Sequence, residues 1–193
     1  MKGLTGILLC GGKSSRMGTD KALLKIQHQH MVSYPLQVMQ QRCSEILISA
    51  NDSRLDFLDY PVICDEITGI GPIGGLYTCL KQSTNDLNLV LACDMPLITG
   101  GVLEKMLQIV QEYDAVVPLV DQRAEPLYAL YHKRILTKIK HSLDQKTYAM
   151  QKMLSQADVY YMTVEPDHEL ELFNVNTPSE ILNYGQLARN IIR

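Results

Sequence analysis

Short apolar runs that alternate with helical patterns are the feature that most limits how this 193-residue chain can fold. Each run is apolar at successive positions, so both faces of the strand need cover, as in a mostly parallel sheet between two layers of helices. We expect strands at 4–9, 46–50, 62–64, 87–93, 115–118, 127–131 and 158–164. We expect helices at 31–42, 74–81, 99–110, 134–143, 149–156 and 178–188. The pattern predicts an α/β protein with three layers, α/β/α, and a Rossmann-like sheet.

Two residues mark the expected starts of helices. Thr99 is expected to cap the helix at 99–110, because threonine side chains accept hydrogen bonds from the first N–H groups of a helix. Pro178 is expected in the first turn of the last helix, where the missing N–H costs nothing.

Length, charge and cysteine use limit the class of protein. The chain has the length of one domain and no repeat or linker, so we predict a single domain over 1–193. A net charge of −3 argues against a nucleic-acid binder, and no apolar stretch is long enough to span a bilayer. The N-terminal residues lack a signal-peptide pattern, which favours the cytoplasm. The five cysteines are expected to be reduced thiols, with a metal shared by Cys10, Cys64 and Cys93 as the alternative.

The first apolar run ends in a glycine-rich, cationic loop, Cys10-Gly11-Gly12-Lys13-Ser14-Ser15-Arg16-Met17-Gly18-Thr19-Asp20-Lys21. Glycines let the backbone come close to a ligand, and consecutive N–H groups form an anion site. The glycine spacing matches neither a Walker A loop nor the dinucleotide fingerprint. Three cations in so short a loop favour a polyphosphate ligand over a plain glycine turn.

Polar residues follow three further apolar runs: Asn51, Asp65 and Asp94. Ligands bind at the carboxyl ends of parallel strands, so these side chains are expected on the same rim as the glycine loop. Asp94 is predicted to hold Mg²⁺ together with substrate phosphates, the alternatives being a helix cap or an arginine pair. Asp65 and Asn51 are candidates for contacts to a ribose or base, with an ordinary turn role as the alternative for both.

The motifs resemble those of the molybdenum cofactor guanylyltransferases. The loop from Leu9 to Lys21 resembles the L-x-G-G-x-S-x-R-M-G-x-D-K signature of that family. Further matches follow in family order: Gly71-Pro72, Gly75-Leu76, Cys93-Asp94-Met95-Pro96, Glu125-Pro126-Leu127 and Asn174-Val175-Asn176-Thr177-Pro178. The resemblance covers nearly the whole chain, and Cys10 departs from it where the family commonly has alanine. It implies a nucleotidyltransferase fold whose first half, to about 96, binds the nucleotide and whose second half, from about 97, binds the acceptor.

The resemblance also implies an activity, in which the GMP part of GTP is joined to the phosphate of molybdopterin and pyrophosphate is released. Mg²⁺ is the implied cofactor, and GTP and molybdopterin are the implied substrates. Transient contacts with other proteins of molybdenum cofactor biosynthesis are expected. The residues carried over are Leu9, Cys10, Gly11 and Gly12 for the nucleotide, Lys21 for the phosphates, Asn51 and Asp65 for the nucleoside, Asp94 for the nucleotide and Mg²⁺, and Asn174 and Asn176 for the acceptor.

Charge neutralisation is the main catalytic task in such a reaction, because the acceptor phosphate and GTP are both anionic. We assign this task to Mg²⁺ held by Asp94, together with Lys21 and Arg16. No general base is needed, since a phosphate monoester is largely ionised at neutral pH. Weaker candidates for acceptor contacts are Arg123, Glu125 and Lys146.

Three other functions stay open. A molybdopterin cytidylyltransferase would run the same reaction with another base, although Gly11 and Asp20 favour guanine within the family patterns. A sugar-1-phosphate nucleotidyltransferase would usually carry a G-x-G-T-R-L loop, which this chain lacks. A non-catalytic nucleotide-binding adaptor could lose the metal carboxylate, whereas Asp94 is retained here.

Overall fold

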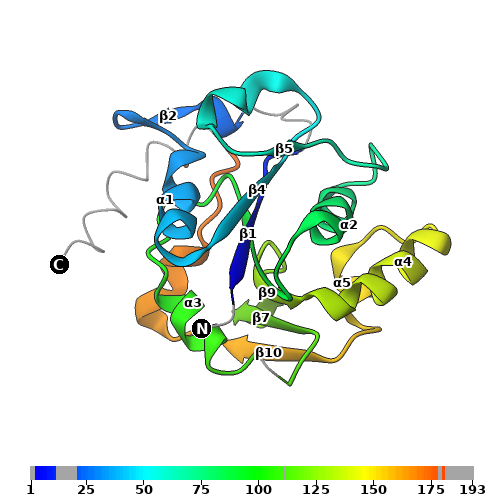
Figure 1. Ribbon diagram of the computed structural model, residues 1–193. Helices are drawn as coiled ribbons and strands as arrows, with labels where there is room; N and C mark the ends of the chain where they lie inside the picture. The colour runs from blue at the N-terminus through cyan, green and yellow to red at the C-terminus, as the bar shows by residue number, and fades with distance from the viewer. Residues whose placement is uncertain (1–2, 12–20, 111, 178–179, 181–193) are drawn as a thin grey trace.

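A central sheet with helices on both faces organises the protein (Figure 1). The computed structural model describes residues 3–11, 21–110, 112–177 and 180. The sheet runs in the order β10–β7–β9–β6–β1–β4–β5, and β8 pairs with β7. Its strands are β1 (Leu4–Leu9), β4 (Glu45–Ser49), β5 (Val62–Ile63), β6 (Leu87–Ala92), β7 (Ala115–Val120), β8 (Arg123–Ala124), β9 (Tyr128–His132) and β10 (Val159–Thr163).

The direction of the strands confirms the prediction of a mostly parallel sheet. Along this path only β9 is reversed, and it pairs antiparallel with both β6 and β7. The other neighbouring pairs on the path are parallel. All the expected strands are present, with small shifts at their ends, whereas β8 and the hairpin of β2 (Lys25–Ile26) with β3 (Gln29–His30) were not expected. Two-residue strands are too short to give an alternating pattern in the sequence.

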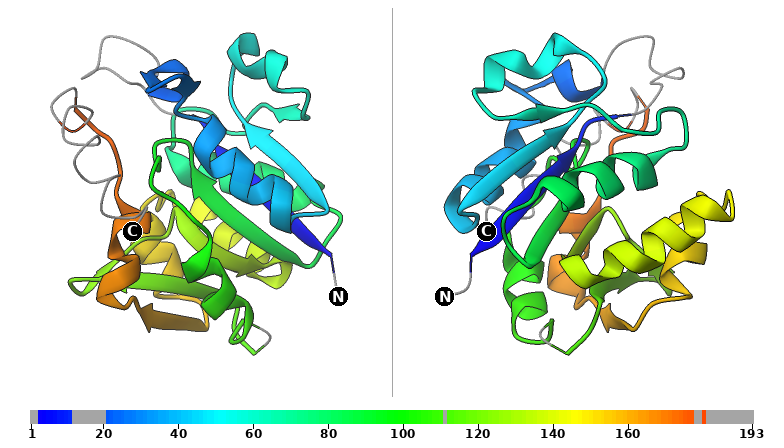
Figure 2. Two further views of the ribbon diagram at one scale, coloured as in Figure 1. Left: turned by 90° about the vertical axis from the view of Figure 1, so that its left-hand side faces the viewer. Right: turned by 45° about the vertical axis from the view of Figure 1, so that its right-hand side comes forward.

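Helices form a layer on each face of the sheet, as Figure 2 shows. One layer holds α1 (Ser33–Arg42) and α3 (Gly101–Leu107), and the other holds α2 (Pro72–Gln82), α4 (Leu136–Asp144) and α5 (Met150–Leu154). Strand β1 shows why both layers are needed. Its residues Leu4 and Leu8 pack into the first layer, while Ile7 and Leu9 pack into the second. Burying each such side chain contributes about 1.5–3 kcal/mol, so an uncovered face would be costly.

The register of the strands places their carboxyl ends side by side. Leu9 at the end of β1 is opposite Ser49 of β4 on one side and Ala92 of β6 on the other. Ser49 is in turn opposite Ile63 of β5. The segments that follow these strands therefore leave the sheet at one edge, as the sequence predicted.

The start of α3 differs from the sequence prediction. Gly100, with a left-handed backbone at φ 92°, is the N-cap, and no side chain of its own segment caps the helix. The carboxylate of Glu171 accepts hydrogen bonds from the backbone N–H groups of Thr99 (3.3 Å) and Gly100 (2.9 Å) instead. The predicted cap by Thr99 was therefore wrong: Gly100 is the N-cap, and the distant carboxylate holds the backbone just before the helix. The expected helix at 178–188 lies, apart from Glu180, outside the described residues.

The structure also bears on two expectations from composition, which concern membrane-spanning helices and the state of the cysteines. In the described ranges, no helix is long and apolar enough to cross a membrane. All five cysteines are described, and none forms a disulfide. Cys10 and Cys93 are buried and Cys64 is exposed, and the described residues contain no group of three or more His, Cys, Asp or Glu side chains placed to hold a metal. A metal shared by these cysteines is therefore not supported.

Candidate active site

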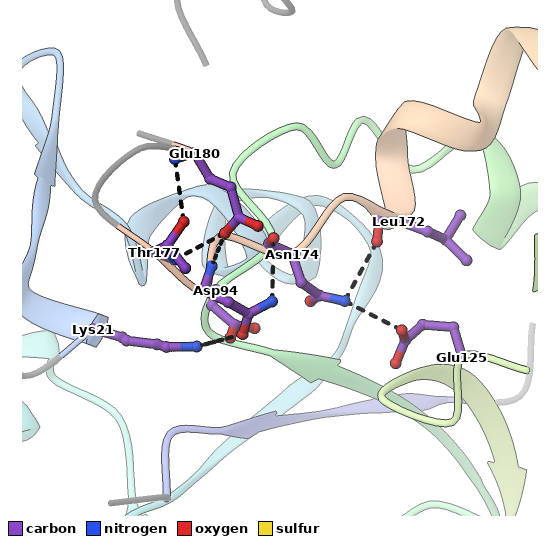
Figure 3. Close-up of polar contacts among 8 residues, drawn as sticks. Lys21, Asp94, Glu125, Leu172, Asn174, Thr177 and Glu180 are labelled. Carbon is purple, nitrogen blue, oxygen red and sulfur yellow. Dashed lines mark hydrogen bonds and ion pairs between the residues drawn. The ribbon is translucent and has the colours of Figure 1, made fainter. Parts of the chain in front are cut away.

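An ion pair between Lys21 and Asp94 stands at the carboxyl edge of the sheet (Figure 3). Lys21 begins the short 3₁₀ helix η1 (Lys21–Leu23), and Asp94 lies in the turn that follows β6. Lys21 Nζ donates to Asp94 Oδ2 at 3.0 Å, and the two side chains are only 20% and 17% exposed. A carboxylate this far from water needs a positive partner. Here that partner is a lysine, neither the arginine nor the helix end considered from the sequence.

A second segment, residues 174–177, lies beside this ion pair and contacts both of its residues. The backbone N–H of Val175 donates to the carbonyl oxygen of Asp94 at 2.9 Å, which fixes the segment beside the end of β6. Asn176 Oδ1 accepts a hydrogen bond from Lys21 Nζ at 2.7 Å. One ammonium group thus holds a carboxylate oxygen and an amide oxygen that lie 82 residues apart in the chain. The structure therefore brings together Lys21, Asp94 and Asn176, three residues to which the resemblance assigned different roles.

Asn174 is held on the other side of the segment by Glu125. Asn174 Nδ2 donates to Glu125 Oε2 at 3.1 Å and to the carbonyl oxygen of Leu172 at 3.4 Å (Figure 3). Glu125 lies between β8 and β9, and its Oε1 accepts from the N–H of Leu127 at 3.3 Å. Burial raises the pKa of the Glu125 carboxyl, and the negative charge of Asp94 raises it further. Glu125 was only a weak candidate from the sequence, and the structure places it in this network.

A capping box follows the asparagines. Glu180 Oε2 accepts from the backbone N–H groups of Asn176 (2.5 Å) and Thr177 (2.8 Å), and the N–H of Glu180 donates to Thr177 Oγ1 at 3.4 Å. This is the capping-box pattern, in which Thr and Glu three residues apart each accept a hydrogen bond from the backbone N–H of the other. The sequence signal, Thr177-Pro178-Ser179-Glu180, was present but not used. This contact holds the backbone of Asn176 in the position from which its side chain meets Lys21.

A cavity of about 610 Å³ opens at the ends of β1, β4 and β5. It is lined by the five described residues expected to contact the nucleotide at the ends of these strands: Leu9, Cys10, Gly11, Asn51 and Asp65. Further lining residues are Ser49, Asp52, Arg54, Gly69, Gly71, Pro72 and Gly75. The cavity has the size of a small-molecule site. Asp52 and Arg54 were missed, because short polar residues between strands look like an ordinary turn in the sequence.

The carboxylate of Asp65 is held from two sides inside this cavity. Its Oδ1 accepts from the buried hydroxyl of Ser49 at 3.1 Å, and its Oδ2 accepts from Asn51 Nδ2 at 3.1 Å. Asn51 Oδ1 in turn accepts from the backbone N–H of Asp65 at 2.8 Å. The two residues proposed for nucleoside contacts therefore form one preorganised unit, and neither is a turn residue that faces only solvent.

Two glycines leave room around the cavity for different reasons. A Cβ on Gly75, in α2, would lie 2.1 Å from Ser49 Oγ, so glycine is required for the helix to approach β4. A Cβ on Gly11 would meet none of the described residues within 4 Å, so none of these requires glycine there. The open space above Gly11 belongs to the cavity, which fits close approach of a ligand to the backbone.

The oxygen atoms around Lys21 also fit a divalent cation. Mg²⁺ prefers carboxylate and amide oxygens, and it is usually held by one or two carboxylates together with substrate phosphates. Asp94 and Asn176 already direct one oxygen each at a single positive group, the ammonium of Lys21. A binding site made by the protein alone would need more ligands than the described residues supply. The donor set therefore suits a metal that arrives with a phosphate substrate.

Several predicted site residues fall outside the described ranges. Gly12 and Arg16 belong to residues 12–20, and so does Lys13. Of the weaker acceptor candidates, Arg123 lies on β8 and Lys146 follows α4 with a left-handed backbone at φ 54°. The sheet, the cavity at the ends of its strands and the nearby lysine–carboxylate pair together suit an α/β protein that binds a phosphate-bearing ligand at this edge.

Comparison with known proteins narrows this class. Residues 6–159 match the family model described as the MobA-like NTP transferase domain, so the chain belongs to the MobA-like NTP transferase family. It is 31% identical over 182 residues to a protein of Flavobacterium johnsoniae named "Probable molybdenum cofactor guanylyltransferase", with 94% of this chain and 96% of the relative covered. A protein of the same name from Pelotomaculum thermopropionicum is 33% identical over 192 residues, with 96% and 94% covered.

A solved structure supports the fold independently. The crystal structure of molybdopterin-guanine dinucleotide biosynthesis protein A from Archaeoglobus fulgidus superposes with a TM-score of 0.81. It covers 96% of this chain and 98% of that chain at 22% sequence identity. The family expected from the sequence motifs is therefore confirmed, and so is the nucleotidyltransferase fold.

Proposed function

We propose that the protein transfers GMP from GTP to the phosphate of molybdopterin and releases pyrophosphate. The observation that carries the proposal is the position of the Lys21–Asp94–Asn176 group beside a cavity with a preorganised nucleoside unit. The names of the relatives supply the base and the acceptor. In this arrangement the guanosine occupies the cavity over Gly11, and its phosphates extend toward Lys21.

The chain's own residues perform three tasks in this proposal. Asp65 and Asn51 hold the nucleoside through oxygen atoms fixed by Ser49 and by each other. Lys21 turns from Asp94 to the phosphates and neutralises charge as the acceptor oxygen approaches the α-phosphorus. A new P–O bond forms there, and the bond to the β-phosphate oxygen breaks, so the electron pair leaves with pyrophosphate.

Mg²⁺ dependence is part of the proposal. Asp94 and Asn176 would hold the ion, which supplies charge neutralisation on the phosphates when it is bound. The glycine loop, with Gly12 and Arg16, is proposed to bind the same phosphates. The proposed location is the cytoplasm, since cysteines without disulfides suit a reducing compartment. Contacts with other proteins of molybdenum cofactor biosynthesis are proposed to be transient.

A nucleotide-binding experiment separates guanylyl from cytidylyl transfer. With Mg²⁺ present and ligand at about 100 times its dissociation constant, GTP is expected to raise the melting temperature by roughly 5–10 °C. CTP is expected to raise it much less at the same concentration. Equal shifts would contradict the choice of base and favour the cytidylyltransferase alternative.

The metal and phosphate roles are tested by turnover. Asp94→Ala is expected to lower kcat by roughly 10²-fold or more and to remove its dependence on Mg²⁺ concentration. Asp144→Ala is the matched control, because this carboxylate is exposed and lies at the end of α4, outside the proposed site. Wild-type turnover in Asp94→Ala would refute the metal assignment. Absence of turnover in the wild-type protein itself would instead favour a non-catalytic adaptor.

A further inference from the structure

The Glu125–Asn174 contact determines which way the side-chain amide of Asn174 is turned. An asparagine amide has one hydrogen-bond donor end and one acceptor end, and its partners decide which way it turns. The partners of Asn174 on one side are a carboxylate oxygen of Glu125 and the carbonyl oxygen of Leu172. Both are acceptors, so the NH₂ group must face them. The carbonyl oxygen, Oδ1, is thereby turned away from Glu125 and Leu172.

Glu125 is itself fixed, so it can impose this orientation. Its second carboxylate oxygen accepts from the N–H of Leu127, and the side chain is mostly removed from solvent. The neighbouring carbonyl of Pro126 accepts from the hydroxyl of the buried Tyr131 at 2.8 Å, which ties the same turn to β9. Even a half-buried carboxylate that made no use of its charge would be an unfavourable choice at this position. The unfavourable desolvation of the Glu125 carboxylate is explained if its charge orients Asn174.

We propose that Glu125 is a positioning residue, which turns Asn174 so that a carbonyl oxygen faces the acceptor substrate. An oxygen acceptor in the cleft repels a phosphate and attracts an N–H donor. Asn174 is therefore matched to a donor edge of the acceptor molecule, while phosphate binding falls to Lys21 on the far side of Asn176. The pyrimidine edge of a pterin carries such donors, a ring N–H and an amino group. This inference rests on the proposed function for the identity of the acceptor, but the orienting contact does not.

A double-mutant cycle distinguishes positioning from general support of the fold. With GTP saturating, Glu125→Ala and Asn174→Ala are each expected to raise the KM for molybdopterin about 10-fold, the loss of roughly one good hydrogen bond. The double variant is expected to match Asn174→Ala, because Glu125 acts through Asn174. Glu125→Gln keeps the size of the side chain but only one of its two acceptor oxygens, so a smaller rise in KM, of about 3-fold, is expected. Glu112→Ala, at an exposed carboxylate, is the matched control.

Two results would overturn the inference: an unchanged KM for molybdopterin in Glu125→Ala, or full additivity in the double variant. A changed affinity for GTP in Glu125→Ala would also overturn it, because Asn174 faces the acceptor. The side-chain amide signals of Asn174 in a ¹⁵N spectrum, assigned by their loss in Asn174→Ala, give a readout that needs no turnover. They should shift in Glu125→Ala, and their constancy would refute the orienting contact. Absence of any transfer by the wild-type protein would refute the proposed function alone.

Discussion

Glu171 is a buried carboxylate whose removal is expected to cost about 3–5 kcal/mol of unfolding free energy. It is 3% exposed, and it accepts from the N–H of Gly100 (2.9 Å), the hydroxyl of Tyr128 (3.1 Å) and the ring of His168 (2.8 Å). In Glu171→Ala the donors of Gly100 and Tyr128 stay buried without a partner, at about 1–3 kcal/mol each, and a cavity adds to the loss. The variant no longer buries a charged group, and the saved desolvation energy offsets part of this cost.

Urea unfolding followed by circular dichroism measures this cost. Glu171→Gln keeps the shape and one acceptor oxygen, so a smaller loss of about 1–2 kcal/mol is expected. Asp167→Ala, at an exposed acidic residue of the same 3₁₀ helix η4 (Pro166–Leu172), is expected to change little. A loss below about 0.5 kcal/mol in Glu171→Ala would refute the idea that this carboxylate joins α3, β9 and the segment leading to Asn174.

The stability difference between wild type and Glu171→Gln is expected to change with pH in one direction. Burial raises the pKa of Glu171, but the hydrogen bonds from Thr99, His168 and Gly100 outweigh it and bring the pKa below its ordinary value of 4.5. A carboxylate with a lowered native pKa stabilises the fold above its unfolded pKa, and this contribution is lost as the pH falls through the native pKa. The stability difference between wild type and Glu171→Gln is therefore expected to be constant above about pH 5 and to shrink below it. A difference that grew on acidification would contradict the assignment.

Three further outcomes are expected at the site. Gly75→Ala should destabilise the protein by about 1–3 kcal/mol and weaken GTP binding in calorimetry, because the new methyl group displaces Ser49 Oγ. Adding Ser49→Ala to the Gly75→Ala variant should recover part of the stability. Wild-type behaviour of Gly75→Ala would contradict the close packing. Cys10→Ala should leave kcat and the KM for GTP within about 2-fold, since both side chains are small and the proposed contacts use the backbone; a large loss would indicate a role for the thiol. Lys21→Ala should lower kcat by roughly 10²-fold, with some loss of stability because Asp94 loses its ion-pair partner. A loss of stability with unchanged kcat would point to a structural role alone.

The sheet was predictable from the sequence because its physical cause is local. The run 4–9 is apolar at almost every position, and β1 is found with the same bounds. Parallel strands with matched register then bring the residues that follow them to one edge, so the shared rim of Asp94, Asp65 and Asn51 follows from the fold class alone.

The long-range side-chain contacts were not predictable in the same way. Glu171 binds the backbone of Gly100, 71 residues earlier in the chain, and Glu125 orients an asparagine 49 residues away. Neither pairing leaves a periodic signal, because each depends on how distant segments meet after folding. The motif around Asn174 identified the residue, but the direction of its amide could only come from the neighbours that the structure places beside it.

The most direct test of the proposed activity is the product itself. Purified protein with GTP, Mg²⁺ and molybdopterin is expected to form molybdopterin guanine dinucleotide and one pyrophosphate per dinucleotide, as measured by mass spectrometry and a coupled phosphate assay. CTP in place of GTP is expected to give little product, and Asp94→Ala should give almost none. Bound GTP without any dinucleotide, or equal use of CTP, would contradict guanylyl transfer by this protein.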